Sequence, residues 1–250
     1  MSPAIQSVRF DHPVAVIGDI HGSRSLLEEL LARLGELPVL VLGDVVDRGP
    51  DSMAVVDVLL RRGARGVVGN HEEWFIAWYR GEGFDDLALK YWMGGEATLD
   101  SYGVAARTPR EIESQLRRVP PEHRAWFDSL ALVMDLEVQG HRYWLIHAGI
   151  PGHLGITGAR ASDVVPWLVQ RHPRTLTWSV TKPEDMIAVD RTVVMGHLPR
   201  DQPIDLGHVI AIDTGAGTLG DEGRLTAVVL PSRRFVTVGY GGVATGACSK

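Results

Sequence analysis

Short apolar runs recur along the chain, and each one ends at a polar or glycine-containing cluster. The runs lie at residues 14–17, 39–42, 66–68, 144–146, 193–195 and 209–212. Runs of this length that are rich in β-branched residues and bounded by glycine are typical of buried strands rather than helices. We therefore predict strands whose carboxyl ends carry the polar clusters.

Helical patterns separate the first three runs. Between residues 26 and 34, leucines recur at helical spacing, with Ser23 or Ser25 placed to cap the start and Gly35 to end the helix. A second helix is predicted over about 51–62. Strands that alternate with helices in this way predict a layered α/β fold, in which ligands bind beyond the carboxyl ends of the strands.

The middle of the chain, about residues 73–135, has a mostly helical pattern and is predicted to form a helical cap. We treat residues 1–250 as one domain that includes this cap. The aromatic residues of the segment are expected to pack inside the cap rather than to stack on bases. They are Trp74, Phe75, Trp78, Tyr79, Trp92 and Trp126.

Composition and charge restrict the possible functions. Apolar residues make up 45% of the 250 residues, charged residues 22%, and the net charge is −6, as in an ordinary globular enzyme. This charge provides no general field for nucleic acid or an anionic membrane. The N-terminus lacks the pattern of a secretory signal and no apolar stretch could span a bilayer, so we expect a cytoplasmic protein.

Metal-ligating residue types occur in the polar clusters. Asp19 and His21 flank one residue after the first strand, so that both side chains can point the same way and share a cation. Later strands end at Asp44 and Asn70, and two further runs precede His147 and His197. Because six ligands of mixed oxygen and nitrogen type exceed one tetrahedral site, we predict two divalent ions bridged by Asp44.

Such an arrangement suits hydrolysis of a phosphate ester by a metal-activated water. His71, next to Asn70, is predicted to donate the proton to the leaving group, and Asp47 to orient its imidazole. Arg48 offers a fork that matches two phosphate oxygens. Taken alone, Asp47 and Arg48 would as readily form a turn-stabilising ion pair.

Five motifs carry a resemblance to a known family. They are GDIHG (18–22), GDVVDRGP (43–50), GNHE (69–72), His147-Ala148-Gly149 and Gly196-His197. Over about residues 14–230 the chain resembles the phosphoprotein phosphatase family of calcineurin-like metallophosphoesterases, and in its cap the bacterial serine/threonine protein phosphatase-like group. The resemblance implies a β-sandwich flanked by helices.

Residue by residue, the resemblance implies the same metal ligands, with Asp44 bridging, Asn70 and His147 on the second ion, and His197 on one or the other. It also implies His71 with Asp47 as the acid pair and Arg48 and Asn70 as substrate contacts. Two Mn²⁺ ions are expected, with Fe or Zn as alternatives. One departure is clear: many relatives carry a phosphate-binding arginine after a Trp-Ser pair, where this chain has Val180. The place of the missing arginine could be taken by Lys182, Arg160, Arg171 or Arg174.

Three functions are compatible with these residues. The first is a serine/threonine protein phosphatase, and the second is a hydrolase of diadenosine tetraphosphate or another dinucleoside polyphosphate, with Tyr91, Trp92 or Trp178 available near the adenine. The third is a catalytically inactive phosphate-binding regulatory module. No stable binding of nucleic acid or membrane is expected, and the sequence leaves the oligomeric state open.

Overall fold

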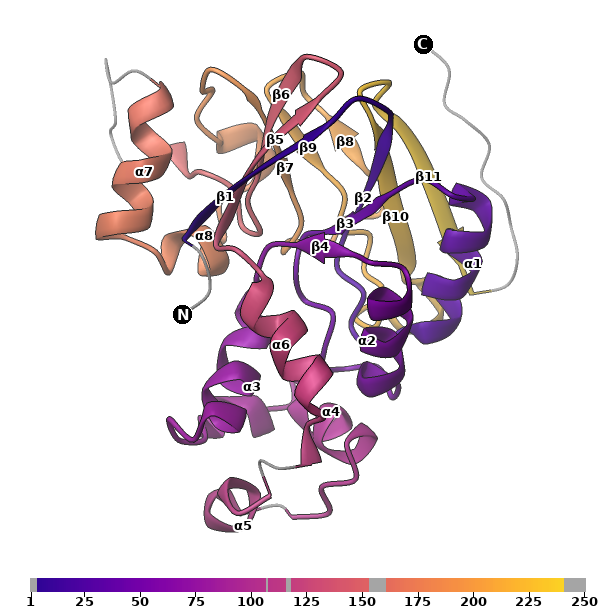
Figure 1. The fold of residues 1–250 in the computed structure, drawn as a ribbon, viewed down its shortest axis with the longest axis vertical. Coiled ribbons are helices and arrows are strands. Elements are labelled where there is room, and N and C mark those ends of the chain that lie inside the picture. Colours follow the sequence, from indigo (N-terminus) through magenta and orange to yellow (C-terminus); the bar gives the residue numbers. More distant parts are fainter. Residues whose placement is uncertain (1–3, 107, 116–117, 153–160, 241–250) are drawn as a thin grey trace.

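Two β-sheets lie face to face and helices cover their outer sides (Figure 1). They are seen in a computed structural model that describes residues 4–240 except 107, 116–117 and 153–160. Across the first sheet the strands are β1 (Ile5–Phe10), β5 (Val133–Val138), β6 (His141–Leu145), β7 (Thr192–Met195), β9 (Val209–Ala211) and β8 (Ile204–Asp205). Across the second they are β11 (Arg234–Gly239), β10 (Arg224–Leu230), β2 (Val14–Ile17), β3 (Val39–Val41) and β4 (Arg65–Gly66).

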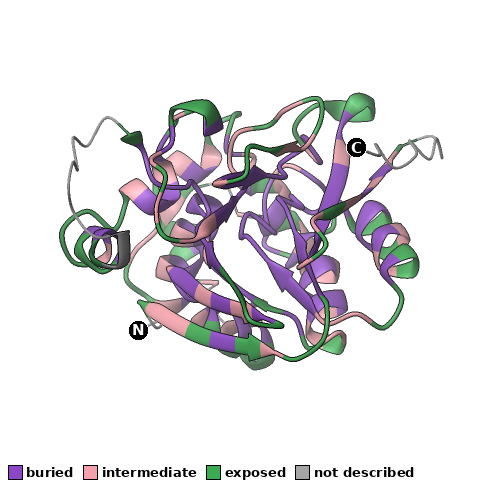
Figure 2. Cartoon of the chain, turned by 90° about the horizontal axis from the view of Figure 1, so that it is seen from above, coloured by how far each residue is buried: buried purple, intermediate pink, exposed green. Residues whose placement is uncertain are grey.

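The predicted sandwich is therefore confirmed, and its core follows from the alternation of side chains along each strand. Val14 and Val16 of β2 join the apolar cluster between the sheets, together with Leu136 of β5. Ala15 and Ile17 belong to the cluster on the outer side, which includes the leucines of α1. A buried strand of this kind has apolar residues at every position because both of its faces are covered. Figure 2 shows buried strands in the interior of the molecule and exposed segments at its periphery.

The two helices predicted near the N-terminus are present as α1 (Arg24–Leu34) and α2 (Ser52–Arg61). Gly35 ends α1 as expected, with φ of 62° and its N–H bonded to the carbonyl of Leu31. Ser23 occupies the N-cap position of α1, as predicted, but its hydroxyl makes no capping hydrogen bond and donates instead to the carbonyl of His21 at 3.4 Å. On the other side of the molecule lie α7 (Ala161–Arg171), α8 (Thr175–Trp178) and the short η4 (Pro183–Asp185).

Helices also fill the segment where the cap was predicted. They are α3 (Asn70–Arg80), η1 (Asp86–Leu89), α4 (Gly95–Ser101), α5 (Pro109–Glu113) and α6 (Pro121–Ser129), which Figure 1 shows gathered below the sheets. The aromatic residues pack there around Phe75, whose ring centre lies 5.1 Å from that of Phe127. Packing inside the cap is confirmed for these residues, but it is wrong for Trp92, which is 50% exposed.

Polar side chains meet at one edge because β2, β3 and β4 run parallel, as do β6 and β7. The third predicted strand is shorter than expected, since Val67 makes only an isolated bridge to Ala131 and the chain turns into α3 after Gly69.

Before β10 lies the short η5 (Gly220–Glu222). Among the described residues, no helix combines the length and apolar character needed to cross a bilayer.

Candidate active site

All six predicted metal ligands come together at this edge of the sandwich. Asp19 and His21 follow β2, Asp44 follows β3, Asn70 begins α3, and His147 and His197 follow β6 and β7. Their side chains are buried, except that His197 is partly buried. The two sheets therefore contribute to a single constellation, although the contributing residues are far apart in the sequence.

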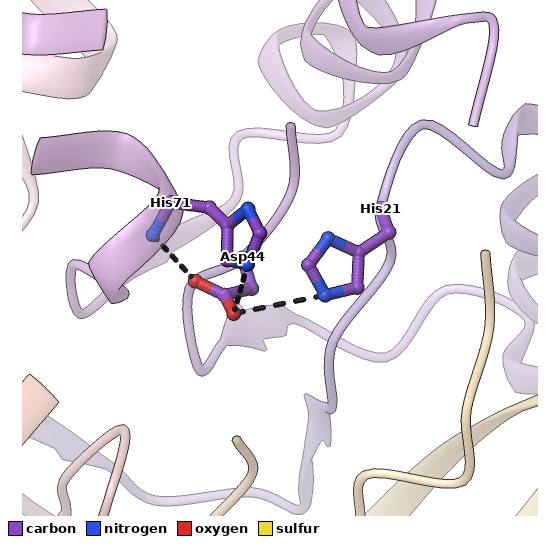
Figure 3. Close-up of side chains that lie close together, drawn as sticks. All are labelled: His21, Asp44 and His71. Atoms are coloured by element: carbon purple, nitrogen blue, oxygen red, sulfur yellow. Dashed lines mark hydrogen bonds and ion pairs between the residues drawn. The ribbon is translucent and has the colours of Figure 1, made fainter. Parts of the chain in front are cut away.

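Asp44 lies at the centre of the constellation. Its Oδ2 is 3.6 Å from Nε2 of His21, 3.4 Å from Nε2 of His147 and 3.9 Å from Nε2 of His71. The donor atoms form two groups that could each hold an ion: Asp44 with His21 and His71 (Figure 3), and Asp44 with His147 and His197. One carboxylate shared by both groups is what a bridging ligand requires.

Asn70 and His197 lie beside His147, on the second group. Nε2 of His147 is 3.0 Å from Oδ1 of Asn70 and 3.2 Å from Nδ1 of His197. The sequence left open which ion His197 would bind, and the structure puts it with His147. Burial and the charge of His147 lower the pKa of His197 to about 3, so His197 is neutral and can offer a lone pair to a metal.

The imidazoles are held in fixed orientations by backbone carbonyls. Nδ1 of His21 donates to the carbonyl of Val46 at 2.9 Å, and Nδ1 of His147 donates to that of Leu42 at 2.8 Å. Such hydrogen bonds fix each ring and direct Nε2 toward the position of a metal, which it can bind once its proton is lost. Both rings therefore present Nε2 toward Asp44.

Buried carboxylates accumulate around these imidazoles. Asp19 accepts the N–H of His197 at 3.0 Å, and burial and the charge of Asp213 raise the pKa of Asp19 well above its usual range. Burial also raises the pKa of Asp213 to about 6. Buried anions are costly unless they are paired or coordinate a metal. The donor set of carboxylate, amide and imidazole groups therefore fits divalent cations.

Asp47 and His71 form a closely bonded pair. Nδ1 of His71 lies 2.8 Å from Oδ2 of Asp47, which also accepts the indole N–H of Trp74 at 2.9 Å. The hydroxyl of Thr98 donates to Oδ1 of Asp47 at 2.7 Å. Burial lowers the pKa of His71, but the charge of Asp44 and the hydrogen bond to Asp47 outweigh it, and the pKa is raised.

Arg48 lies over the first donor group. Its Nη2 is 3.1 Å from Nε2 of His71, and its Nη1 is 2.5 Å from Nε2 of His21. Nη1 also donates to the hydroxyl of Thr218 at 2.6 Å. The guanidinium therefore lies against the imidazoles of the first donor group instead of forming an ion pair with Asp47.

The backbone of the site is unusual. Five of its residues have positive φ although none is glycine: His21 (44°), Asp44 (49°), Asp47 (71°), Arg48 (66°) and His197 (70°). A left-handed backbone is uncommon for residues other than glycine and is found at functional sites where the surrounding structure enforces it.

Glu72 supports the site, although the sequence analysis gave this residue no role. Its Oε2 accepts the backbone N–H groups of Asp44 and Gly69, and its Oε1 accepts that of Val45, each at 2.8 Å. Burial and the charge of Asp44 raise the pKa of Glu72 to about 7. Because Glu72 belongs to the motif GNHE, the sequence could have identified it as a residue of the site. Asp213 directly follows the apolar run 209–212, which was a weaker signal, and nothing in the sequence identified Thr218.

A second basic residue lies close to the donor groups. Arg174 and Asn70 line one cavity of about 120 Å³, and the guanidinium of Arg174 is 5.3 Å from the ring centre of Trp178. Arg174, Lys182 and Arg171 are all exposed, and of these three only Arg174 lines this cavity. Arg160, the remaining alternative from the sequence, lies outside the described residues.

The comparisons with known proteins agree with this site. The calcineurin-like phosphoesterase family matches residues 12–229. The chain is 26% identical to the asymmetrical bis(5'-nucleosyl)-tetraphosphatase PrpE of Oceanobacillus iheyensis, over 90% of this chain and 91% of the relative. It is 27% identical to serine/threonine-protein phosphatase 2 of Escherichia coli K12, over 82% of this chain and 88% of the relative.

A protein serine/threonine phosphatase from Saccharomyces cerevisiae has a similar fold, with a TM-score of 0.57 and 18% identity, covering 98% of this chain and 86% of that one. Because the family match spans most of the chain and includes every residue of the constellation, the chain belongs to the calcineurin-like phosphoesterases and is a metal-dependent phosphoric ester hydrolase.

Proposed function

We propose that the chain is a serine/threonine protein phosphatase that hydrolyses phosphate monoesters. The observation that carries this proposal is the carboxylate of Asp44, shared by two groups of donors, with Arg48 and the Asp47–His71 pair beside it. The relative from Escherichia coli, a serine/threonine-protein phosphatase, supports the choice of substrate.

The metal ligands in this proposal are those predicted from the sequence. Asp19, His21 and Asp44 would hold one ion, and Asp44, Asn70, His147 and His197 would hold the other. Two Mn²⁺ ions, when bound, neutralise the charge of the phosphate and activate a water for attack. The remaining steps depend on side chains of this chain.

Arg48 binds two oxygens of the phosphate through its planar fork, and the amide of Asn70 faces the same group. As the water oxygen forms its bond to phosphorus, the bond to the serine or threonine oxygen breaks. His71, protonated at Nε2, gives its proton to that oxygen, so that a neutral alcohol leaves. Asp47 holds Nδ1 of His71 and stabilises the positive charge of the imidazolium.

Hydrolysis of dinucleoside polyphosphates is the second candidate. It is supported by the relative from Oceanobacillus iheyensis and by the exposed rings of Tyr91 and Trp92, which could contact a nucleobase. Arg174 would then contact a second phosphate. A catalytically inactive module is disfavoured, because the ligands, Arg48 and the acid pair all come together.

The test is hydrolysis by the metal-stripped protein, resupplied with Mn²⁺, of three substrates side by side: p-nitrophenyl phosphate, a phosphothreonine peptide and diadenosine tetraphosphate. The proposal expects the highest kcat/KM on the peptide. A preference for the dinucleotide would establish the second candidate instead, and no turnover of any substrate with metals bound would refute both.

A further inference from the structure

A turn formed by residues 91–94 is fixed against Arg48. The backbone N–H of Arg48 donates to the carbonyl of Gly94 at 3.0 Å, and Nε of Arg48 donates to the carbonyl of Trp92 at 3.4 Å. The two segments are so close that a Cβ added at Gly94 would lie 2.8 Å from the backbone nitrogen of Arg48. The turn and the phosphate-binding arginine therefore form one rigid unit.

The same turn exposes two aromatic side chains. Met93 is 2% exposed and anchors the turn in the cap, whereas Tyr91 is 91% exposed and Trp92 is 50% exposed. The two rings contact each other edge to face, with centres 5.2 Å apart. Large aromatic rings held in this way at a protein surface lose little conformational freedom when a partner binds.

A second segment that contacts Arg48 also has an exposed apolar side chain. Thr218 accepts a hydrogen bond from Arg48, and the next residue, Leu219, is 40% exposed. This segment is fixed as well, since a Cβ added at Gly217 would lie 2.7 Å from the Cβ of His21. We call Tyr91, Trp92 and Leu219 the apolar rim, because they lie on the two segments that bond the side chain of Arg48.

We propose that the apolar rim is a docking surface for the polypeptide that carries the phosphorylated residue, and that it receives an apolar or aromatic side chain next to that residue. This inference rests on the proposed function and names the substrate feature that the site selects. The occupant is argued from the continuity of the rim with the arginine that binds the phosphate.

The exposure of the rim favours a polypeptide over a nucleoside. Sites for small molecules are usually cavities of about 300–1,000 Å³ that enclose most of the ligand. The cavity beside Asn70 has about 120 Å³, and the rings of Tyr91 and Trp92 stand at the surface. Leu219 lines a larger cavity of about 620 Å³, but that cavity is bordered by Asp221 and Arg224 instead of Arg48 and the two rings. Exposed tryptophan and tyrosine side chains are enriched where proteins bind one another, and a few of them provide most of the binding energy.

The experiment compares Trp92→Ala and Tyr91→Ala with the unchanged protein on three substrates. Two are phosphothreonine peptides, one with leucine and phenylalanine beside the phosphorylated residue and one with glycine and serine there. The third is N-acetyl-phosphothreonine amide, which has no flanking residues. We expect Trp92→Ala to lower kcat/KM for the apolar peptide about tenfold, mainly by raising KM.

The same variant should change kcat/KM for the amide by less than about twofold, because the carbonyl that bonds Arg48 remains. Trp167→Ala is the matched control, since Trp167 is 41% exposed on α7 and contacts His172 instead of the site. It should behave like the unchanged protein on all three substrates.

Three results would overturn the inference while the proposed function stands. The first is equal cleavage of the two peptides by the unchanged protein, and the second is an equal loss on the amide and the apolar peptide in Trp92→Ala. The third, measured with diadenosine tetraphosphate as an additional substrate, is a loss confined to that dinucleotide, which would assign the rim to a nucleobase. If the unchanged protein, with metals bound, cleaves none of these phosphate esters, the proposed function falls together with the inference.

Discussion

Glu72 accepts the backbone N–H of Asp44 at 2.8 Å and thereby ties the first turn of α3 to the loop that carries the shared carboxylate. Its other hydrogen bonds, from Val45 and Gly69, close the same junction. The position of Asp44, and with it the relation between the two donor groups, therefore depends on a buried side chain that contacts no substrate.

Replacing Glu72 by glutamine should loosen this junction. In the unchanged protein each of these backbone N–H groups has a carboxylate oxygen as its acceptor. In the variant an amide NH₂ would replace one of the oxygens, and each buried donor left unpaired costs about 1–3 kcal/mol. We expect a loss of about 2–4 kcal/mol in the free energy of unfolding and weaker metal binding. Denaturant titration and metal analysis measure both effects. Glu28→Gln, which alters an exposed ion pair with Arg24, should change neither. Unaltered stability in Glu72→Gln would refute the positioning role.

Replacing His71 by asparagine should slow turnover about 10²–10⁴-fold, the usual contribution of a general acid, with both metals retained. Protonated His71 is lost as pH rises through its pKa, so the unchanged protein should lose activity on the alkaline side and the variant should lack this decline. In Asp47→Asn the support for the charged imidazole is gone, and the decline should move to lower pH. Loss of one metal from His71→Asn would identify His71 as a ligand instead.

Metal removal should separate catalysis from folding. A chelator should abolish turnover while the circular dichroism spectrum persists, because the sandwich core does not depend on the ions, and Mn²⁺ should restore activity. Asp44→Asn should weaken binding of both ions, whereas His147→Ala should release one. Measurement of metal per chain by mass spectrometry distinguishes these outcomes. Equal loss from both variants would contradict the bridging position of Asp44.

Replacing Thr218 by valine should release Nη1 of Arg48 from its 2.6 Å hydrogen bond. We expect KM to rise about three- to tenfold, as the loss of a roughly 1 kcal/mol hydrogen bond implies, with less change in kcat. Thr218→Ser keeps the hydroxyl, so its KM should equal that of the unchanged protein. Thr192→Val is the control, since it removes a 2.7 Å hydrogen bond from Arg233 elsewhere. If Thr218→Val and Thr192→Val have the same kinetics, Thr218 does not position Arg48.

Much of the site could be predicted because its ligands directly follow short apolar runs. Asp19, Asp44 and His147 each follow the buried end of a strand, and parallel strands bring such ends to one edge. The first part of the fold followed from the same pattern. The sandwich itself was expected only through the family resemblance, because the antiparallel pairing of β10 with β2 joins segments from opposite ends of the chain.

What the sequence could not show depends on contacts between distant segments. Asp213 ends an apolar run like the ligands do, yet only the folded chain places its charge beside Asp19. Tryptophan is usually a core residue, but the hydrogen bonds from Arg48 to the carbonyls of Trp92 and Gly94 fix this turn so that the ring of Trp92 faces solvent. Neither placement follows from local pattern.

The left-handed backbone of the site has a consequence for any attempt to make this protein more heat-resistant. At His21, Asp44, Asp47, Arg48 and His197 the conformation costs on the order of 1 kcal/mol each, which glycine would relieve. At Asp47 this gain is smaller than the loss, because glycine would leave the indole N–H of Trp74 and the hydroxyl of Thr98 buried without an acceptor, at about 1–3 kcal/mol each. The strain is therefore retained by the same hydrogen bonds that build the site, and greater heat resistance must come from substitutions elsewhere in the chain.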